Sequence, residues 1–308
     1  MAGGFVHITV AAEAIGRLEG VAGLSAADKM AISQFMPFVE VGSVGPDYPY
    51  LGRQSEWADR LHYQNTGEVI CNGVRILRDY GSGPHRSRCL SWLLGYAAHV
   101  ATDLTIHPVV QGRVGPYAEN KTAHRTCEMH QDAFIWPRRN LGELGLADYF
   151  RNNINHCSTP RGDLNADLVA FWRQMLQTTY PDDFEQDPPA FDRWNRGFKL
   201  VVDTIDDAGS LIPFTRHMLA SVGAVYPRSD AIDMTFIEEL ETPEGSMHYD
   251  DVFIRAVDAV VRVWSVIGEA LRAGTPDEMD DRLAAIPNGN LDTGISLVHG
   301  ELIFWRAA

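Results

Sequence analysis

Cysteine is scarce in this sequence. Its four cysteines, Cys71, Cys89, Cys127 and Cys157, lie far apart among 308 residues, and no two of them form a CxxC pair. This spacing argues against a disulfide-stapled scaffold and against a zinc site built from paired thiolates. Free thiols, as in the reducing cytoplasm, are therefore the expectation for all four.

Long apolar runs are missing as well. No stretch reaches the length of about 18 apolar residues that a membrane-spanning helix needs. The first residues, MAGGFVHITVAAEAIG, lack the basic start and the sustained apolar segment of a signal peptide. We therefore expect no transmembrane segment and a cytoplasmic location, with a mature secreted chain as the open alternative.

Positive charge is in short supply. The chain has 26 Lys and Arg against 41 Asp and Glu, which gives a formal net charge of -15. Non-specific nucleic-acid binding depends on a basic surface, so we expect no nucleic-acid partner of that kind. The acidic balance does not exclude an enzyme acting on a phosphodiester, because a bound cation inverts the local charge.

Helical periodicity is abundant. Clusters of Gly and Pro, such as VGPDYPYLG and TTYPDDFEQDPP, separate the periodic stretches. Ser25 is a predicted helix N-cap, and the chain from Asp79 to Pro84 is a predicted helix stop. No stretch alternates long enough to predict a sheet, so we expect the all-α class, with residues 1–308 in one multi-helical domain. The predicted helices are His7–Val21, Ala26–Phe38, Glu56–Asp79, Cys89–Ile106, Thr122–Trp136, Leu164–Thr179, Phe198–Val222 and Val252–Ala273.

The stretch GYAAHVATDLTIHP places polar residues in an otherwise apolar predicted helix. His99, Asp103 and His107 follow one another at intervals of four residues, and at about 3.6 residues per turn they share one helix face. Burying three polar side chains on one stripe is unfavourable unless they are paired or bind something. The stretch predicts either an internal hydrogen-bond network or one wall of a metal site.

A second stretch, HRTCEMHQD, repeats this spacing with His124, Glu128 and Asp132, while His130 points to another face. Imidazole and carboxylate ligands without paired cysteines suit zinc, with iron or manganese as the alternative. Two histidines and one carboxylate leave coordination positions open, which favours catalysis over a purely structural site. Further candidate ligands in the first 135 residues are His7, Asp47 and His62.

In this order the candidate ligands resemble those of the zinc-dependent phospholipase C family, which is related to the single-strand-specific zinc nucleases. The fragment LLGYAAHVATDLTIHP is especially similar to the family's central helix, and its short HxxxDxxxH spacing resembles the branch related to glycosylphosphatidylinositol phospholipase D. The resemblance covers about residues 1–135 and implies an all-helical fold with a cluster of three zinc ions at the bottom of a cleft. Residues 136–308 carry no such resemblance, and we expect this helical half to supply pocket walls.

The resemblance assigns the ligands to separate zinc ions. A first zinc would be held by Asp47, His62, His99 and Asp103. A second would be held by His107, His124 and Glu128. Asp103 would also bridge to a third zinc, which His7 binds.

Two further residues follow from the same resemblance. Asp132 would orient His124 or another ligand, a role that fixes the tautomer and basicity of an imidazole. Tyr48, directly after Asp47, resembles an aromatic residue that lines the head-group pocket.

The N-terminus departs from the family pattern. Secreted members complete the third site with a processed N-terminal tryptophan, and no tryptophan stands in MAGGFVH. If Met1 is removed, the amine of Ala2 lies five residues before His7, as in the nuclease branch. We therefore expect two or three zinc ions, the third depending on Ala2.

The expected function is hydrolysis of a phosphodiester or phosphomonoester in a small molecule or lipid, with Asp47 as general base. One alternative is an iron- or manganese-dependent biosynthetic enzyme on the same scaffold. The other is a non-catalytic, metal-stabilised binding protein. The oligomeric state stays open.

Overall fold

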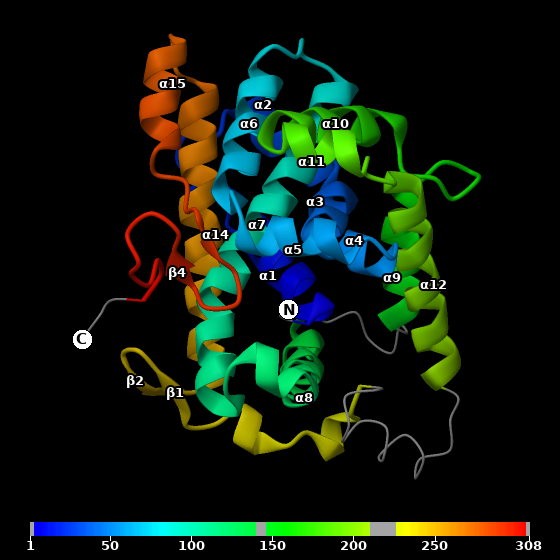
Figure 1. Ribbon diagram of the computed structural model, residues 1–308, viewed down its shortest axis with the longest axis vertical. Coiled ribbons are helices and arrows are strands. Elements are labelled where there is room, and N and C mark those ends of the chain that lie inside the picture. The colour runs from blue at the N-terminus through cyan, green and yellow to red at the C-terminus, as the bar shows by residue number, and fades with distance from the viewer. Residues whose placement is uncertain (1–2, 140–145, 210–225, 306–308) are drawn as a thin grey trace.

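The computed structural model describes residues 3–139, 146–209 and 226–305. Helices dominate these residues, as the all-α class predicts (Figure 1). The longer helices are α1 (Gly4–Gly16), α2 (Ala26–Gln34), α5 (Ser55–Tyr63), α6 (Thr66–Arg78), α7 (Pro84–Val114), α8 (Tyr117–Ile135), α9 (Leu146–His156), α10 (Ala166–Thr179), α12 (Phe191–Gly209), α14 (Tyr249–Leu271) and α15 (Pro276–Leu283). The shorter ones are α3 (Met36–Gly42), α4 (Tyr48–Leu51) and α11 (Pro181–Gln186), with 3-10 turns η1 (Leu18–Gly20), η2 (Gly45–Asp47), η3 (Trp136–Arg139), η4 (Ser229–Ala231) and η5 (Met234–Phe236).

Two small antiparallel hairpins, which the sequence did not predict, complete the described elements. In one, β1 (Leu240–Thr242) pairs with β2 (Gly245–Met247). In the other, β3 (Gly289–Asn290) pairs with β4 (Ile295–Ser296).

The central element is α7, which runs side by side with α14 along the molecule (Figure 1). Every residue of α7 from Cys89 to Ile106 is buried, so this helix is covered on all sides by its neighbours. Two tryptophans from the C-terminal part of the chain attach to its backbone. The indole of Trp264 donates to the carbonyl of Leu94 at 2.8 Å, and the indole of Trp305 donates to the carbonyl of Thr105 at 2.8 Å.

Helices α3 and α7 approach each other unusually closely because glycines face the contact. A Cβ placed on Gly95 would lie 2.1 Å from the carbonyl oxygen of Val39 and 2.8 Å from the amide nitrogen of Ser43. The absence of a side chain at Gly95 thus lets the end of α3 rest on α7. This brings the carbonyl of Ser43 within reach of His99.

Two of the predicted helices are broken in the structure. The predicted helix Ala26–Phe38 divides into α2 and α3 at Phe35, whose φ of -111° and ψ of 31° are not helical. Pro37 lies two residues further on, in the first turn of α3, where a proline fits because the amide hydrogen that it lacks would have no helical partner. The predicted helix Glu56–Asp79 divides into α5 and α6 at Asn65, which adopts the left-handed conformation with φ 51°. Asparagine tolerates this conformation better than most residues.

One predicted helix is longer than expected. Helix α7 continues beyond Ile106 through Pro108 and ends at Val114. Proline is unfavourable inside a helix because it lacks an amide hydrogen. Here the residues on either side, His107 and Val109, are buried, and their packing keeps the helix continuous. The extension keeps His107 on the same helix as His99 and Asp103.

The remaining predicted boundaries agree with the described elements to within about three residues, except that α1 ends at Gly16 and not at Val21, and that α7, α8 and α12 begin five or more residues early. Ser25 caps α2 by accepting from the amide of Asp28, and α6 and α7 are separated between Asp79 and Pro84 as predicted. The predicted end of a helix at Val222 lies outside the described residues.

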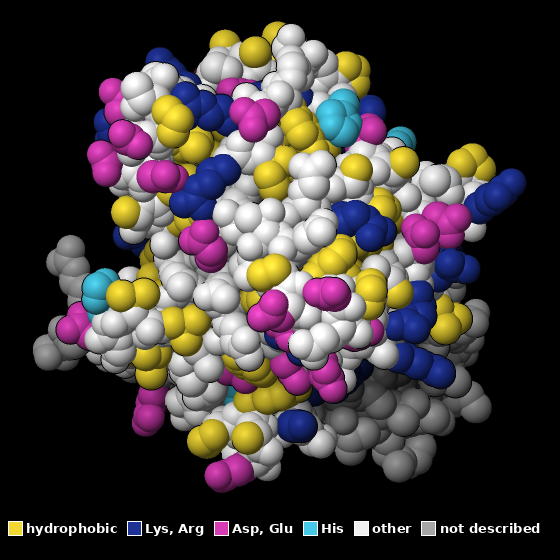
Figure 2. All heavy atoms as spheres, turned by 45° about the horizontal axis from the view of Figure 1, so that its top comes forward, with side chains coloured by type: hydrophobic (Ala, Val, Ile, Leu, Met, Phe, Trp, Pro, Cys, Tyr) yellow, Lys and Arg dark blue, Asp and Glu magenta, His cyan; other side chains and the backbone are white. Residues whose placement is uncertain are grey.

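One cluster of buried hydrophobic residues runs from Phe5 in α1 to Trp305 near the C-terminus. The described residues before and after position 135 thus share one hydrophobic core. Among the described residues no helix has the combination of length and hydropathy required to cross a bilayer. Figure 2 shows acidic side chains distributed over one face of the molecule, with Lys and Arg interspersed among them.

Candidate metal centre

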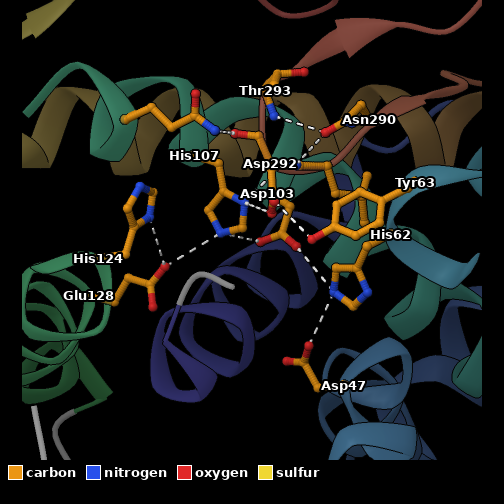
Figure 3. A network of polar contacts seen from close by, with 12 residues as sticks. Asp47, His62, Tyr63, Asp103, His107, His124, Glu128, Asn290, Asp292 and Thr293 are labelled. Carbon is orange, nitrogen blue, oxygen red and sulfur yellow. Dashed lines mark hydrogen bonds and ion pairs between the residues drawn. The ribbon is translucent and has the colours of Figure 1, made fainter. Parts of the chain in front are cut away.

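Five elements bring the predicted ligands together. The ligands are carried as follows: His7 by α1, Asp47 by η2, His62 by α5, His99, Asp103 and His107 by α7, and His124 and Glu128 by α8. All eight belong to one network of polar contacts, of which Figure 3 shows the greater part.

Asp103 lies at the middle of this network and is fully buried. Its Oδ1 is 3.3 Å from Nε2 of His7 and 3.3 Å from Nε2 of His107. Its Oδ2 is 3.0 Å from Nε2 of His99 and 3.9 Å from Nε2 of His62. One carboxylate therefore faces four imidazoles, with two on each oxygen.

Two groups of side chains have the compactness of a metal site. In the first, His7, His99 and Asp103 offer ligand atoms within 4.8 Å of one another. In the second, Asp47 and His62 join His99 within the same distance, and Oδ1 of Asp47 is 3.2 Å from Nε2 of His62.

A third group lies on the other side of Asp103, where α7 faces α8. Nε2 of His107 is 3.7 Å from Oε1 of Glu128, and Nδ1 of His124 is 3.9 Å from the same oxygen. His107 of α7 and His124 and Glu128 of α8 therefore point toward one another (Figure 3).

Backbone carbonyls fix the orientation of four of these histidines. Nδ1 of His62 donates to the carbonyl oxygen of Ala58 at 2.7 Å. In the same way, Nδ1 of His99 donates to the carbonyl oxygen of Ser43 at 2.9 Å, and Nδ1 of His107 donates to the carbonyl oxygen of Leu291 at 2.8 Å. In His124 the roles are exchanged, because Nε2 donates to Gly115 at 2.8 Å. In each ring the other nitrogen points at a carboxylate, and in the neutral form of the ring this nitrogen carries the lone pair that a metal ligand requires.

The electrostatics favour the ligating protonation states. Burial alone would raise the pKa of Asp103, but His107, His99 and His7 outweigh it and hold that pKa well below the usual range. Burial likewise opposes the shift at Asp47, whose pKa is lowered chiefly by His99 and His62. Burial lowers the pKa of His107 well below its ordinary value despite the attraction of Asp103. The carboxylates are thus charged and His107 is neutral, the forms that bind metal.

The donor set fits a metal ion. Nε2 of His107 and Nδ1 of His124 are buried and lack a hydrogen-bond partner among the described residues. A buried polar atom without a partner is unfavourable, and a cation between the imidazoles and the carboxylates would satisfy both. Imidazole nitrogen with carboxylate oxygen is a donor set that zinc accepts.

Asp132, predicted to orient His124 or another ligand, contacts the start of α1. It is fully buried and accepts from the amide of Val6 at 2.7 Å and from that of Phe5 at 3.3 Å. The hydroxyl of Tyr226 donates to it at 3.1 Å. Because these amides begin α1, Asp132 fixes the helix that carries His7, and so acts on another ligand through the backbone.

Tyr48 lies in the aromatic core. Its side chain is fully buried, with its ring 6.0 Å from that of Trp92 and 4.9 Å from that of Phe198. A fully buried ring cannot line a substrate pocket in this conformation, so the structure does not support the expected head-group contact. The sequence placed Tyr48 correctly beside Asp47 but gave no information on which way its ring turns.

Other residues reach the cluster without having been predicted. The rings of Tyr50 and Tyr63 lie 5.8 and 6.2 Å from that of His62, and the ring of Tyr117 lies 5.3 Å from that of His124. Asp292, from the C-terminal part, has Oδ1 3.8 Å from Nδ1 of His107. No spacing in the sequence links these positions to the ligands. The predicted Ala2 amine lies outside the described residues.

A comparison with known families agrees with this geometry. The family profile described as zinc dependent phospholipase C matches residues 6–181, more than half of the chain. The chain belongs to the zinc-dependent phospholipase C family. Membership identifies it as a zinc-dependent hydrolase of that type, and the match extends beyond the residues 1–135 that carry the sequence resemblance. Comparisons with curated proteins and with solved structures find no match.

Proposed function

We propose that this protein hydrolyses a phosphodiester or phosphomonoester bond in a lipid or a small molecule, at a centre of two or three zinc ions. The observation that carries the proposal is the position of Asp103, whose two oxygens face four imidazoles inside a buried cluster. Such a carboxylate is suited to bridge metal ions. Family membership supports zinc in preference to iron or manganese.

The three groups of side chains described above support the assignment of ligands to three zinc sites that the resemblance implies. Asp47, His62 and His99 face one position, and His107, His124 and Glu128 face another. His7 and Asp103 face the third, beside His99. We assign the ligands accordingly, with Asp103 shared between sites.

Zinc, when bound, neutralises phosphate oxygens and lowers the pKa of water near the reacting phosphorus. Asp47 is placed to take the proton of the attacking water, because it is charged and lies at the edge of the cluster with 14% of its side chain exposed. The water oxygen forms a bond to phosphorus while the bond to the leaving oxygen breaks. The proton taken by Asp47 returns through solvent to the alcohol that leaves.

Metal analysis and a phosphoester panel test the proposal. The full-length protein is purified without chelator, its zinc, iron and manganese are quantified, and it is assayed on p-nitrophenyl phosphate, a p-nitrophenyl phosphodiester and phospholipid vesicles. We expect bound zinc, and hydrolysis that is abolished by chelation and restored by zinc. Iron as the bound metal would favour the biosynthetic alternative, and bound zinc without any hydrolysis would favour a binding protein.

A further inference from the structure

A short turn from the C-terminal part of the chain reaches the metal cluster. It comprises residues 290–294, between β3 and β4, far beyond the end of the family match at residue 181. The carbonyl of Leu291 accepts the Nδ1 proton of His107 at 2.8 Å, and the amide of Leu291 donates to the carbonyl of His62 at 2.9 Å. One buried residue of the turn thus contacts two predicted ligands from different helices.

The next residue, Asp292, has its carboxylate beside the same imidazole. Oδ1 of Asp292 is 3.8 Å from Nδ1 of His107, and Oδ2 accepts from the hydroxyl of Tyr63 at 2.8 Å (Figure 3). The backbone carbonyl of Asp292 accepts from the side chain of Gln111 at 2.7 Å. Asp292 is thereby held from both sides, with its negative charge on the face of His107 opposite Asp103 and Glu128.

The turn itself is built to stay in place against α7. The side chain of Asn290 accepts from the amides of Asp292 and Thr293 at 3.0 and 3.2 Å. Gly294 has φ 70°, and a Cβ there would lie 2.5 Å from Cγ of Pro108. Only glycine fits such a close approach in this conformation. The backbone of the turn therefore rests directly on the helix that carries His107.

We propose that Asp292 and the carbonyl of Leu291 form a positioning element for the metal centre, which sets the tautomer and orientation of His107 and so the affinity for the zinc that His107 binds. The inference rests on the proposed function, since it requires that His107 be a ligand. A carboxylate and a carbonyl behind a ligating imidazole keep the proton on the outer nitrogen and increase the basicity of the inner one. Asp292 acts through His107 and need not touch the substrate.

A second tyrosine–aspartate pair on the same side of the cluster provides a matched control. The hydroxyl of Tyr50 donates to Asp59 at 2.7 Å, and the ring of Tyr50 also neighbours His62. No contact between Asp59 and a predicted ligand is found among the described residues. The variants Asp59→Asn and Tyr50→Phe therefore make the same chemical changes as Asp292→Asn and Tyr63→Phe, but at a hydroxyl and a carboxylate that face each other and not the imidazole of His107.

The experiment measures zinc affinity by equilibrium dialysis for the full-length parent and the four variants. It also records the ¹⁵N spectrum of labelled histidine in the metal-free proteins, with the His107 signals assigned through His107→Gln. For Asp292→Asn we expect the affinity of one zinc equivalent to fall by about ten- to a hundredfold, and the fraction of His107 protonated at Nδ1 to fall with it. Tyr63→Phe should lower the zinc affinity and the fraction of His107 protonated at Nδ1 by a smaller amount than Asp292→Asn does. The two control variants should match the parent in both quantities.

Equal zinc affinity and equal His107 signals in Asp292→Asn and the parent would overturn the inference and leave the proposed function intact. A parent that binds no zinc would refute the proposed function, and this inference would fall with it. If Asp292→Asn does not fold, as judged by loss of a cooperative thermal transition, the zinc affinity of Tyr63→Phe tests the inference instead. This variant keeps the carboxylate of Asp292 but removes the hydroxyl that holds it.

Discussion

At the scale of the single residue, Asp103 is a buried carboxylate that four imidazoles surround. A fully buried carboxylate is unfavourable unless it is paired, and here its partners are four imidazoles held by the backbone or by stacking. His7, for example, stacks on His99 with ring centroids 4.0 Å apart. The cluster therefore depends on this one charge.

The first prediction concerns metal content. Asp103→Asn should lose more bound zinc than any single histidine variant, because it removes charge from both oxygens that face the imidazoles. We expect a loss of at least two zinc equivalents, against about one for His124→Gln, measured by elemental analysis of the purified variants. Equal metal content in Asp103→Asn and the parent would show that Asp103 binds no metal.

The second prediction concerns Asp47 as the general base. Asp47→Asn should lower kcat by about 10²-fold or more, the range over which positioned bases contribute. Asp59→Asn, on the neighbouring helix α5, should leave kcat near that of the parent. Both variants are assayed at saturating zinc, so that a change in metal affinity does not enter kcat. A parent-like rate in Asp47→Asn would exclude this role.

What the sequence could predict at this scale follows from its spacing. Residues four apart on a helix share a face whatever surrounds them, so the stripe His99, Asp103 and His107 was predictable. The direction of the Tyr48 ring was not, because it is decided by aromatic neighbours such as Trp92. The roles of Ser43 and Leu291 could not be predicted either, since a backbone carbonyl has no signature in the sequence.

At the scale of the element, α1 is positioned by a single side chain at its start. Asp132 accepts the first amides of the helix, and Gly3 leaves room for it, since a Cβ there would lie 1.9 Å from Oδ2. Burial raises the pKa of Asp132 to about 8, although the amides of Val6 and Phe5 oppose the shift.

This shift predicts a pH dependence of stability. Between about pH 4 and 8 the folded metal-free protein keeps the proton of Asp132, which the unfolded chain has released. The unfolded state then binds fewer protons, so the free energy of unfolding falls as the pH rises across this window. Asp132→Asn should have a flatter profile than the parent in denaturant titrations of chelated protein. Parallel profiles would contradict the shift.

The contact between α3 and α7 gives a further prediction. Gly95→Ala should destabilise the protein by about 1–3 kcal/mol, the usual range for overpacking, and should weaken zinc binding by displacing Ser43 from His99. Gly16→Ala is the control, because a Cβ at Gly16 meets nothing within 4 Å. It should be neutral or stabilising by up to about 1 kcal/mol. Denaturant titration and zinc dialysis of both variants test this.

Helix boundaries show why local patterns were insufficient at this scale. Apolar periodicity continues through Asn65, so the sequence predicted one helix where the structure has two. The break is set by distant contacts: Thr66 donates to the carbonyl of Gly289 at 2.8 Å. At Pro108 the error is the opposite one. Helix propensity alone predicts that the helix ends near this proline, whereas packing lets α7 continue to Val114.

At the scale of the whole molecule, the cluster joins α1, near the start of the family match, with α5, α7 and α8 and with a turn beyond the match. Metal removal should therefore lower stability globally. We expect chelation to lower Tm by on the order of 5–10 °C, since a ligand present far above its Kd contributes about 4 kcal/mol. Added zinc should restore Tm in calorimetry. An unchanged Tm would mean that no metal bridges these elements in the folded protein.

The all-α class and the family were predictable from the sequence because they depend on periodicity and on the order of the ligands. The C-terminal half was not interpretable in this way. Within the described part of this half, the contacts with predicted ligands include the Asp292 carboxylate and the Leu291 carbonyl, in a turn whose sequence, NLDTG, looks like many others.

The position of Leu291 in the chain has a consequence for biosynthesis. A ribosome has already made every predicted ligand when it reaches Glu128, yet the residue that contacts both His62 and His107 is synthesised more than 160 residues later. At about 5–20 residues per second, the nascent chain spends at least several seconds with all the predicted ligands but without Leu291, whose backbone contacts His62 and His107. The complete centre therefore forms only after residue 291 has been synthesised.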